Sequence, residues 1–482
     1  MDWTNIFLHN SVEPLLFHNG FFLLIFSLFL IFYAFIFHKL KVRDIAIILF
    51  GFYFYYKSSG IFILLLVLSL SADYLFSIWM SRNKNLKQKK AILIAGILFS
   101  LSFLIYFKYR NFFIDNLSTI TGENYNLSNL ILPIGISFYT FQSISYLVDV
   151  YQNKLKPSGF KNYMLYMTFF PHLVAGPIVR ARDFLPQIEH QTLLTKEKIN
   201  EALYLIVKGL IKKAIIADYI AQYSDSVFSA PDGFSGTENL IATLSYTLQI
   251  FCDFSGYTDM AIGIALLLGF RLCVNFNSPY KSLNITNFWR RWHISLSSWL
   301  RDYIYIPFGG NKKGFSLQLL FLFLTMLIGG FWHGASWKFV FWGAGHGLLL
   351  IIHKLYMLKF PNKNNNIIFK IASWAFTFIC VSLLWIPFRA VTFSDALIVY
   401  EKIFTDINFS YLSAIYATNP LLIYMLLFGF SATMLPNKIK DFIKNKYYES
   451  DIIFKIFFLA LVIQLFLQVK SSSVQPFIYF QF

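Results

Sequence analysis

The strongest constraint on the fold of this chain is the recurrence of long apolar segments along almost its whole length. A helix needs about 20 apolar residues, at 1.5 Å per residue, to cross a bilayer. Such segments lie near residues 20–38, 44–56, 60–79, 90–107, 129–150, 199–217, 239–269, 315–330, 339–353, 367–388, 419–435 and 453–469. Hydrophobic residues make up 57% of the chain and charged residues only 13%, which excludes a soluble or disordered protein. We therefore expect an all-α polytopic membrane protein with about 11–13 transmembrane helices.

One further apolar stretch, residues 162–190, does not read as a continuous helix. Its pattern is broken by Pro171, Gly176, Pro177 and Pro186. Irregular backbone at membrane depth is tolerated only where protein or water satisfies it, so a re-entrant or surface-lying segment is expected. His172 lies in this segment, where it could line a pore or cap a turn.

Positive charge is concentrated in the loops between the apolar segments. The net charge is 41 − 24 = +17, and the basic loops are 39–43, 81–90, 271–313 and 437–449. The loop 218–237 instead carries three aspartates and no basic residue. The positive-inside rule places the basic loops in the cytosol and the acidic loop outside. Membrane lipids and cytosolic phosphate esters are then the expected partners of the positive charge, and no nucleic acid is needed to explain it.

A histidine follows two glycines at the end of an apolar segment, in the run Gly329-Gly330-Phe331-Trp332-His333-Gly334. Glycine lets backbone or substrate approach closely, and histidine exchanges a proton near neutral pH. A histidine hydrogen-bonded within a helix-end packing motif would give the same pattern. The density of glycine and tryptophan around His333 favours a functional role.

A second histidine lies within residues 287–302, where helical spacing predicts an amphipathic helix on the cytosolic side. Its apolar stripe would be Trp292, Leu296, Trp299 and Tyr303. Its polar stripe would be Arg290, His293, Ser297 and Arg301. An electrostatic anchor to anionic lipid would explain the arginines. The histidine between arginines favours instead a site for a phosphate-bearing cytosolic donor.

Two aspartates interrupt the apolar segment 239–269. Asp253 and Asp259 project from different sides of a helix, so they do not make the carboxylate pair of a glycosidase. A structural role, through hydrogen bonds or an arginine partner such as Arg271 or Arg290, is favoured over catalysis. The cysteines, Cys252, Cys273 and Cys380, lack metal-ligand or disulfide spacing, and no metal site is expected. Phosphate-binding loops and a G-x-S-x-G elbow are also absent from the sequence.

Taken in order, five segments resemble the membrane-bound O-acyltransferase family: residues 133–142, 170–180, 253–259, 287–310 and 330–337. The most similar branch is the bacterial one that contains alginate O-acetylase and the integral-membrane peptidoglycan O-acetyltransferase. The motif-bearing core spans about residues 130–350 of a single integral-membrane domain, 1–482, with peripheral helices over 1–129 and 351–482. The resemblance implies a ring of helices around a thin central floor, in the bacterial inner membrane.

The resemblance also implies a reaction. Acetyl-CoA would enter from the cytosol as co-substrate, and its acetyl group would be delivered outside to a polysaccharide such as alginate or peptidoglycan. In this branch an extracytoplasmic acetyltransferase partner often receives it. His333 matches the family's essential histidine and is expected to be the general base; His293 matches a second, semi-invariant polar position. The expected substrate-binding residues are Asn287, Arg290, Arg291, Arg301 and Trp332. A thioester is already activated, so no bound cofactor or metal is expected.

Two other functions fit a chain of this composition. One is a transporter that moves an acetyl or polysaccharide unit without making bonds, although no internal repeat is visible in the sequence. The other is a lipid acyltransferase of the same superfamily, which needs a lateral opening for a long acyl chain. The bacterial resemblance favours acetyl transfer over both.

Overall fold

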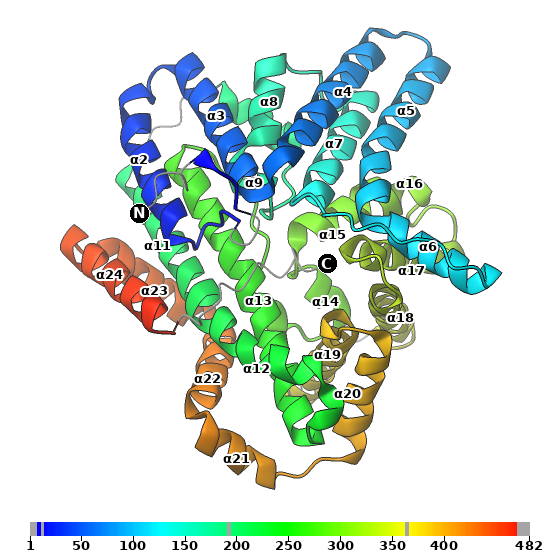
Figure 1. The fold of residues 1–482 in the computed structure, drawn as a ribbon, viewed down its shortest axis with the longest axis vertical. Coiled ribbons are helices and arrows are strands. Elements are labelled where there is room, and N and C mark those ends of the chain that lie inside the picture. The colour runs from blue at the N-terminus through cyan, green and yellow to red at the C-terminus, as the bar shows by residue number, and fades with distance from the viewer. Residues whose placement is uncertain (1–6, 11–13, 190–193, 362–365, 470–482) are drawn as a thin grey trace. The chain divides into compact units, whose positions relative to one another are not determined.

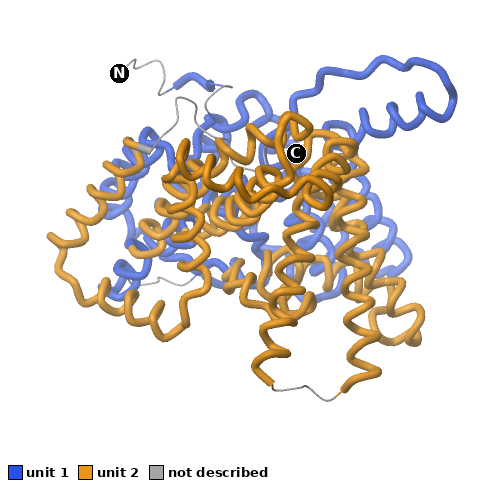
Figure 2. The backbone as a smooth tube through the Cα atoms, turned by 90° about the horizontal axis from the view of Figure 1, so that it is seen from below, with its two compact units in different colours: residues 1–203, 260–273 blue, residues 204–259, 274–482 orange. Residues whose placement is uncertain are grey.

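The structure is a computed structural model that describes residues 7–10, 14–189, 194–361 and 366–469. Within these ranges every regular element is helical (Figure 1), which confirms the all-α prediction. The chain divides into two compact units (Figure 2). Unit 1 comprises residues 1–203 and 260–273, and unit 2 comprises residues 204–259 and 274–482. Helices α11 and α13 contribute residues to both units.

The helices that begin in unit 1 are α2 (Gly20–Ile36), α3 (Leu40–Ser59), α4 (Ile63–Arg82), α5 (Leu86–Leu104), α6 (Arg110–Thr121), α7 (Ile136–Tyr151), α8 (Phe160–Thr168), α9 (Phe170–Leu173), α10 (Ala181–Ile188) and α11 (Lys196–Leu210). A π-helical turn, Ile105–Tyr109, joins α5 to α6.

The helices that begin in unit 2 are α12 (Asp218–Ser229), α13 (Gly236–Leu267), α14 (Ile285–Trp289), α15 (Ile294–Leu300), α16 (Ile306–Phe308), α17 (Phe315–His333), α18 (Trp337–Lys359), α19 (Ile367–Arg389), α20 (Phe393–Thr405), α21 (Ser410–Thr418), α22 (Pro420–Met434), α23 (Asn437–Glu449) and α24 (Ile452–Val469). The π-helical segments Ile211–Ala217 and Arg301–Tyr305 follow α11 and α15.

Fewer helices qualify as membrane spans than the sequence predicts. Among the described residues, six helical segments are long and apolar enough to cross a membrane, or seven if the bent pair α21 and α22 forms one span. The predicted segments 44–56 and 60–79 fall within one of these, Leu40–Arg82. The predicted segment 129–150 corresponds to α7, a 16-residue helix whose residues are nearly all buried. Its apolar sequence reflects a protein core, which periodicity alone does not distinguish from lipid contact.

Helix α13 is the best enclosed of the candidate spans. In its most apolar window 83% of the residues are buried, against 17–33% in the other five spans. The outer helices therefore present apolar side chains outward, as expected of a surface in contact with lipid, whereas α13 is surrounded by protein. Polar side chains on α13 thus lie where protein groups can satisfy them.

In unit 1, the interrupted segment breaks on either side of Pro171 and at Gly176 and Pro177, as predicted, but Pro186 lies inside α10 rather than at a break. It forms three short helices, α8, α9 and α10, separated by irregular turns. Side chains from the segment itself bind the backbone that these breaks release. His172 Nε2–H donates to the Tyr166 carbonyl at 2.7 Å, since a carbonyl oxygen can only accept a hydrogen bond. The Tyr166 hydroxyl donates to the Val179 carbonyl at 2.8 Å.

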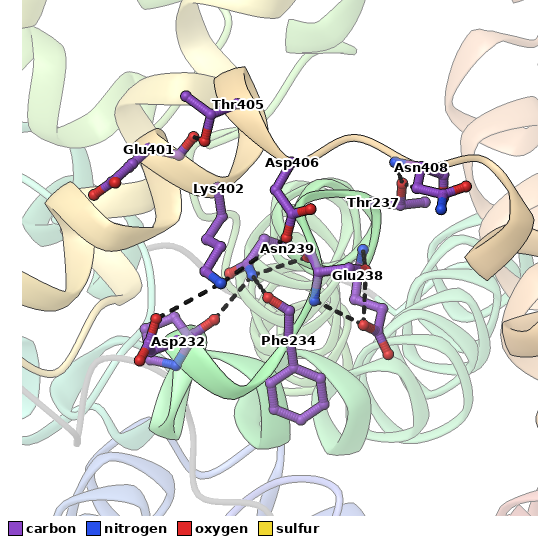
Figure 3. A network of polar contacts seen from close by, with 12 residues as sticks. Asp232, Phe234, Thr237, Glu238, Asn239, Glu401, Lys402, Thr405, Asp406 and Asn408 are labelled. Atoms are coloured by element: carbon purple, nitrogen blue, oxygen red, sulfur yellow. Dashed lines mark hydrogen bonds and ion pairs between the residues drawn. The ribbon is translucent and has the colours of Figure 1, made fainter.

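In unit 2, the first turn of α13 is fixed by the segment that follows α20 (Figure 3). The Gly236 amide donates to the Asp406 carbonyl at 3.0 Å, and the Thr237 hydroxyl donates to the Asn408 carbonyl at 2.9 Å. Lys402 forms an ion pair with Asp232 at 3.6 Å. The acidic segment 218–237, expected to be a loop, thus forms α12 over Asp218–Ser229, and its last residues are bonded to the segment that follows α20 (Figure 3).

Candidate active site

The position of His333 is set by a close crossing of α17 and α18. Gly330 lies directly against the backbone of α18, and a Cβ there would stand 2.8 Å from the Cα of Gly343 and would overlap the Phe339 carbonyl. Small residues at a helix crossing allow this approach. The crossing leaves only a short turn between His333, the last residue of α17, and Trp337, the first residue of α18.

His333 is buried among aromatic rings. Its imidazole lies 5.0 Å from the ring of Trp332, 5.0 Å from that of Trp342 and 5.2 Å from that of Phe388, measured between centroids. The latter two rings meet it edge-on, in a geometry that is favourable for aromatic pairs. Helices α17, α18 and α19 thus each contribute a wall around one titratable group.

The predicted amphipathic helix over residues 287–302 is wrong. The chain forms α14 and α15 with a break between them, and His293 at the break has φ = +41° and ψ = +56°. Few non-glycine residues adopt this left-handed conformation, and those that do need their surroundings to hold it. The polar stripe is lost with the helix: His293 is fully buried, whereas Arg290 and Arg301 are exposed.

Asn275 holds the break in place. Its side-chain oxygen accepts hydrogen bonds from the Ser295 amide at 3.1 Å and the Ser295 hydroxyl at 2.8 Å. The same oxygen lies 3.1 Å from His293 Nδ1, so Nδ1 carries the proton and the lone pair is on Nε2. Burial lowers the pKa of His293 from 6.5 to about 3, which keeps this imidazole neutral at physiological pH.

Both histidines contact the same indole. The Trp332 ring lies 5.0 Å from the His333 ring and 6.4 Å from the His293 ring, with tilts of 71° and 63°. On its other side His293 meets Phe254 of α13 edge-on at 4.6 Å. Two imidazoles from different segments of the sequence, residues 287–302 and 330–337, are thereby brought to one aromatic wall in unit 2.

The family model for the membrane-bound O-acyltransferase family matches residues 48–364, about two thirds of the chain. The chain belongs to this family. It is 37% identical to a probable alginate O-acetylase AlgI of Pseudomonas putida, over 81% of this chain and 84% of that protein. It is 39% identical to a peptidoglycan O-acetyltransferase of Helicobacter pylori, over 69% and 68% of the two chains. It is 32% identical to a teichoic acid D-alanyltransferase of Bacillus subtilis, over 47% and 60%. The expected family and enzyme class, a multi-pass membrane O-acyltransferase, are confirmed.

Sequence reasoning about this acyltransferase missed a third histidine. His346, on α18, is fully buried and accepts a hydrogen bond at Nδ1 from Trp289 Nε1 at 3.3 Å. Its ring lies 4.7 Å from that of Trp342, which also contacts His333. The sequence feature that could have identified His346 is its position one helical turn after Trp342, on the same face of the helix.

The residues expected to bind the acyl donor are dispersed by the break. Arg301 is exposed and paired with Asp302 at 2.7 Å, and Arg291 is half-buried with a long contact to the Asn277 carbonyl at 3.5 Å. The amide of Asn287 donates to the Asn284 side chain at 2.8 Å, as part of the N-terminal cap of α14. Of the predicted substrate-binding residues, Trp332 is the one that contacts both histidines.

The two aspartates of α13 form ion pairs with lysines of the π-helical segment. Asp253 lies 3.2 Å from Lys213, which is fully buried and also pairs with Asp218 at 2.8 Å. Asp259 pairs with Lys212 at 2.7 Å. The structural interpretation of these acids fits this geometry, but the suggested partners Arg271 and Arg290 are wrong. The spacing of Asp253 and Asp259 along α13 does not indicate which other helix supplies the cation.

Proposed function

We propose that this chain is an acetyl-CoA-dependent O-acetyltransferase that moves an acetyl group across the inner membrane for the O-acetylation of a cell-envelope polysaccharide or exopolysaccharide. The observation that carries the proposal is the pair of buried histidines, His333 and His293, on one indole at the end of α17. The names of the relatives that match most of this chain support acetyl as the group transferred. The D-alanyltransferase matches over less than half of it.

In the proposed reaction, His333 acts as general base. It takes the proton of an acceptor hydroxyl as that oxygen attacks the thioester carbonyl of acetyl-CoA, forming the new C–O bond. The C–S bond breaks as the tetrahedral intermediate collapses, and the proton passes from the imidazolium to the departing thiolate. The aromatic walls exclude water, which would otherwise compete with the acceptor for the acetyl group.

His293 serves to position the substrate rather than to exchange the main proton, because its Nε2 lone pair can accept a hydrogen bond but has no proton to donate. Its buried, neutral imidazole is held by Asn275 with Nδ1 protonated, so the orientation of the ring is fixed before substrate binds. Pre-organised polar groups of this kind need no reorganisation during the reaction. Arg291 is two residues before His293 and is half-buried, so it is the arginine best suited to contribute to donor binding.

The charge pattern supports delivery to the outside. His333 contacts Phe388, and the next residue, Arg389, pairs with Asp225 of α12, which belongs to the acidic segment 218–237 that the positive-inside rule places outside. Helix α17 begins after the basic stretch 271–313 and ends at His333. The proposed topology therefore admits the donor from the cytosolic end and presents the acyl group towards the acidic end, through the thin floor of the family's ring. An extracytoplasmic acetyltransferase partner is the proposed acceptor.

The experiment that tests this proposal follows both products in proteoliposomes. Purified full-length chain receives acetyl-CoA labelled in the acetyl group, with and without an acceptor polysaccharide and candidate partner, and free thiol is measured alongside the label. Acetyl transfer predicts thiol release together with label in the polysaccharide or partner. Label that crosses the membrane without thiol release would show a transporter, and label recovered in lipid rather than in polysaccharide or partner would show a lipid acyltransferase. Either of these results would overturn the proposal.

A further inference from the structure

Five basic side chains from three separate segments lie near one another in unit 2. They are Lys208, Lys212, Lys281, Arg291 and Lys440. Helix α23 links the segments: Lys440 Nζ donates to the Ser278 hydroxyl at 3.0 Å, and Lys281 Nζ lies 3.5 Å from the Asn437 side-chain oxygen. Two of the basic loops identified in the sequence, 271–313 and 437–449, therefore meet in space. We call these five residues the basic cluster.

Aromatic contacts between α11 and α23 bring the lysines of α11 and of its π-helical extension close to Lys440. The Tyr204 ring lies 5.6 Å from that of Tyr447 and 6.1 Å from that of Tyr448. One and two turns further along, Lys208 and Lys212 share the carboxylate of Asp259, at 3.1 Å and 2.7 Å. One acid thus partly neutralises two of the five cations.

The other three cations of the cluster have no such acid. Among the described residues, Lys281, Arg291 and Lys440 form no ion pair. Lys440 and Lys281 are held instead by neutral acceptors, the Thr433 carbonyl at 3.1 Å for Lys440 and the Leu435 carbonyl for Lys281. Asp441, the neighbour of Lys440, is exposed and pairs with none of them. All five basic side chains are half-buried, where water screens their mutual repulsion less than on an open surface.

The charge repulsion is visible at Lys440. Burial and then the charges of Lys281, Lys212 and Lys208 lower its pKa from 10.5 to about 8. Burial and the charge of Arg291 also lower the pKa of Lys281. With a pKa of about 8, Lys440 is still mostly protonated at neutral pH, so its ammonium is held near other basic side chains. An anion bound among them would remove this unfavourable term.

We infer that the basic cluster is a binding site for phosphate groups, with Lys281 and Lys440 as its principal ligands. Each lysine ammonium has three N–H donors, and the contacts above leave at least one on each for a phosphate oxygen. The ligand is either the phosphate portion of a coenzyme A thioester or the headgroup of an anionic phospholipid. The first alternative rests on the proposed function and gives it a donor site different from Arg290 and Arg301.

The test measures binding of inorganic pyrophosphate and of coenzyme A to the full-length chain in a neutral detergent, by calorimetry. The variants are Lys281→Gln, Lys440→Gln and their combination, with Lys281→Arg and Lys440→Arg as charge-preserving variants. Lys446→Gln is the matched control, since Lys446 is on the same helix but is exposed and paired with Glu449 at 2.9 Å. We expect each glutamine variant to weaken binding about tenfold, and the arginine variants and the control to bind as the native chain does.

A second arm separates the two sources of phosphate. Native chain and double glutamine variant are reconstituted in nanodiscs of phosphatidylcholine with or without phosphatidylglycerol, and lipid retained on detergent extraction is quantified. Loss of coenzyme A binding in the double variant identifies the nucleotide, and loss of retained phosphatidylglycerol alone identifies the headgroup; both support a phosphate site. A folded double variant that binds pyrophosphate, coenzyme A and phosphatidylglycerol as tightly as the native chain would overturn the inference. Acetyl transfer with an unchanged KM for acetyl-CoA in that variant would at the same time leave the proposed function standing.

Discussion

Each unit of this acyltransferase buries a histidine among aromatic rings, and the two histidines differ in how they are held. In unit 1, His172 is enclosed by Tyr166, Phe169 and Phe184, and its Nε2–H is committed to a backbone carbonyl at 2.7 Å. In unit 2, His333 is the last residue of α17, next to the turn into α18, and its walls come from three helices.

The comparison shows that burial among aromatic rings does not by itself identify a catalytic histidine. His172 satisfies a carbonyl that a helix break releases, and burial lowers its pKa from 6.5 to about 4, so it serves as a neutral structural donor. His333 shares a tryptophan with a second polar residue, His293, whose orientation is itself fixed. A structural histidine is expected to matter for stability, and a catalytic one for rate.

The largest expected effect is on the rate of acyl transfer after His333→Ala. Removing a general base costs about 10²- to 10⁴-fold in kcat, whereas the aromatic walls around the site remain. Thiol release from acetyl-CoA in the presence of acceptor measures the rate, and the thermal unfolding midpoint in detergent measures folding. A well-folded His333→Ala chain with native kcat would show that His333 does not act in the mechanism and that its role, like that of His172, is structural.

The second effect is on stability, after His172→Ala. The substitution leaves the Tyr166 carbonyl without its donor and a cavity between three rings, which should lower the free energy of unfolding by about 2–4 kcal/mol. The kcat per folded molecule should stay within about twofold of native, since no step of the proposed reaction uses unit 1. Denaturation in detergent and activity normalised to the folded fraction separate the two quantities. Unchanged stability with lost activity would place His172 in the reaction instead.

Much of this contrast was accessible from the sequence. Pro171 and Pro177 predict the helix breaks of residues 162–190, although Pro186 does not interrupt α10. The glycines around His333 predict a close approach, which the crossing of Gly330 and Gly343 provides. Local signals of this kind depend on residues a few positions apart, so periodicity and turn chemistry reveal them. The apolar core of α7 was read as a membrane span because a buried helix and a lipid-facing helix have the same composition.

The parts of the site that could not be predicted depend on contacts between distant residues. Asn275 lies in an extended stretch with no periodic pattern, yet its oxygen accepts from His293 and from both donors of Ser295. The left-handed conformation of His293 follows from these contacts rather than from the helical pattern of residues 287–302. Helical spacing favoured a continuous amphipathic helix there, and tertiary hydrogen bonds overrode that preference.

A third prediction therefore concerns Asn275→Ala. Without the side-chain oxygen, His293 loses the partner that fixes its tautomer and ring orientation, and we expect kcat to fall about tenfold with a smaller change in KM. Asn284→Ala is the control, because Asn284 caps the neighbouring helix α14 by accepting from the Asn287 amide at 2.8 Å and does not contact His293. Equal losses of kcat in both variants would mean that Asn275 acts only by supporting the local fold.

The smallest expected effect is a pH dependence of stability that sharpens the contrast between a buried and an exposed histidine. His172 lies outside the candidate membrane spans, and its folded-state pKa of about 4 is below the value near 6.5 expected in the unfolded chain. The unfolded state therefore binds a proton first as pH falls. The stabilising contribution is complete above pH 6.5 and is lost as pH decreases towards 4.

Between pH 8 and pH 6 the loss from this one residue is about 1 kcal/mol, and it depends on the unfolded pKa alone because the folded chain stays unprotonated throughout. His172→Gln, whose amide can still donate to the Tyr166 carbonyl, should unfold with a midpoint that decreases about 1–2 °C less than that of the native chain over this range. His38→Gln, at an exposed position, should retain the native dependence. If His172→Gln and the native chain lose stability in parallel, then His172 takes up a proton equally in the folded and unfolded states, and the folded chain does not hold it as a neutral donor to the Tyr166 carbonyl.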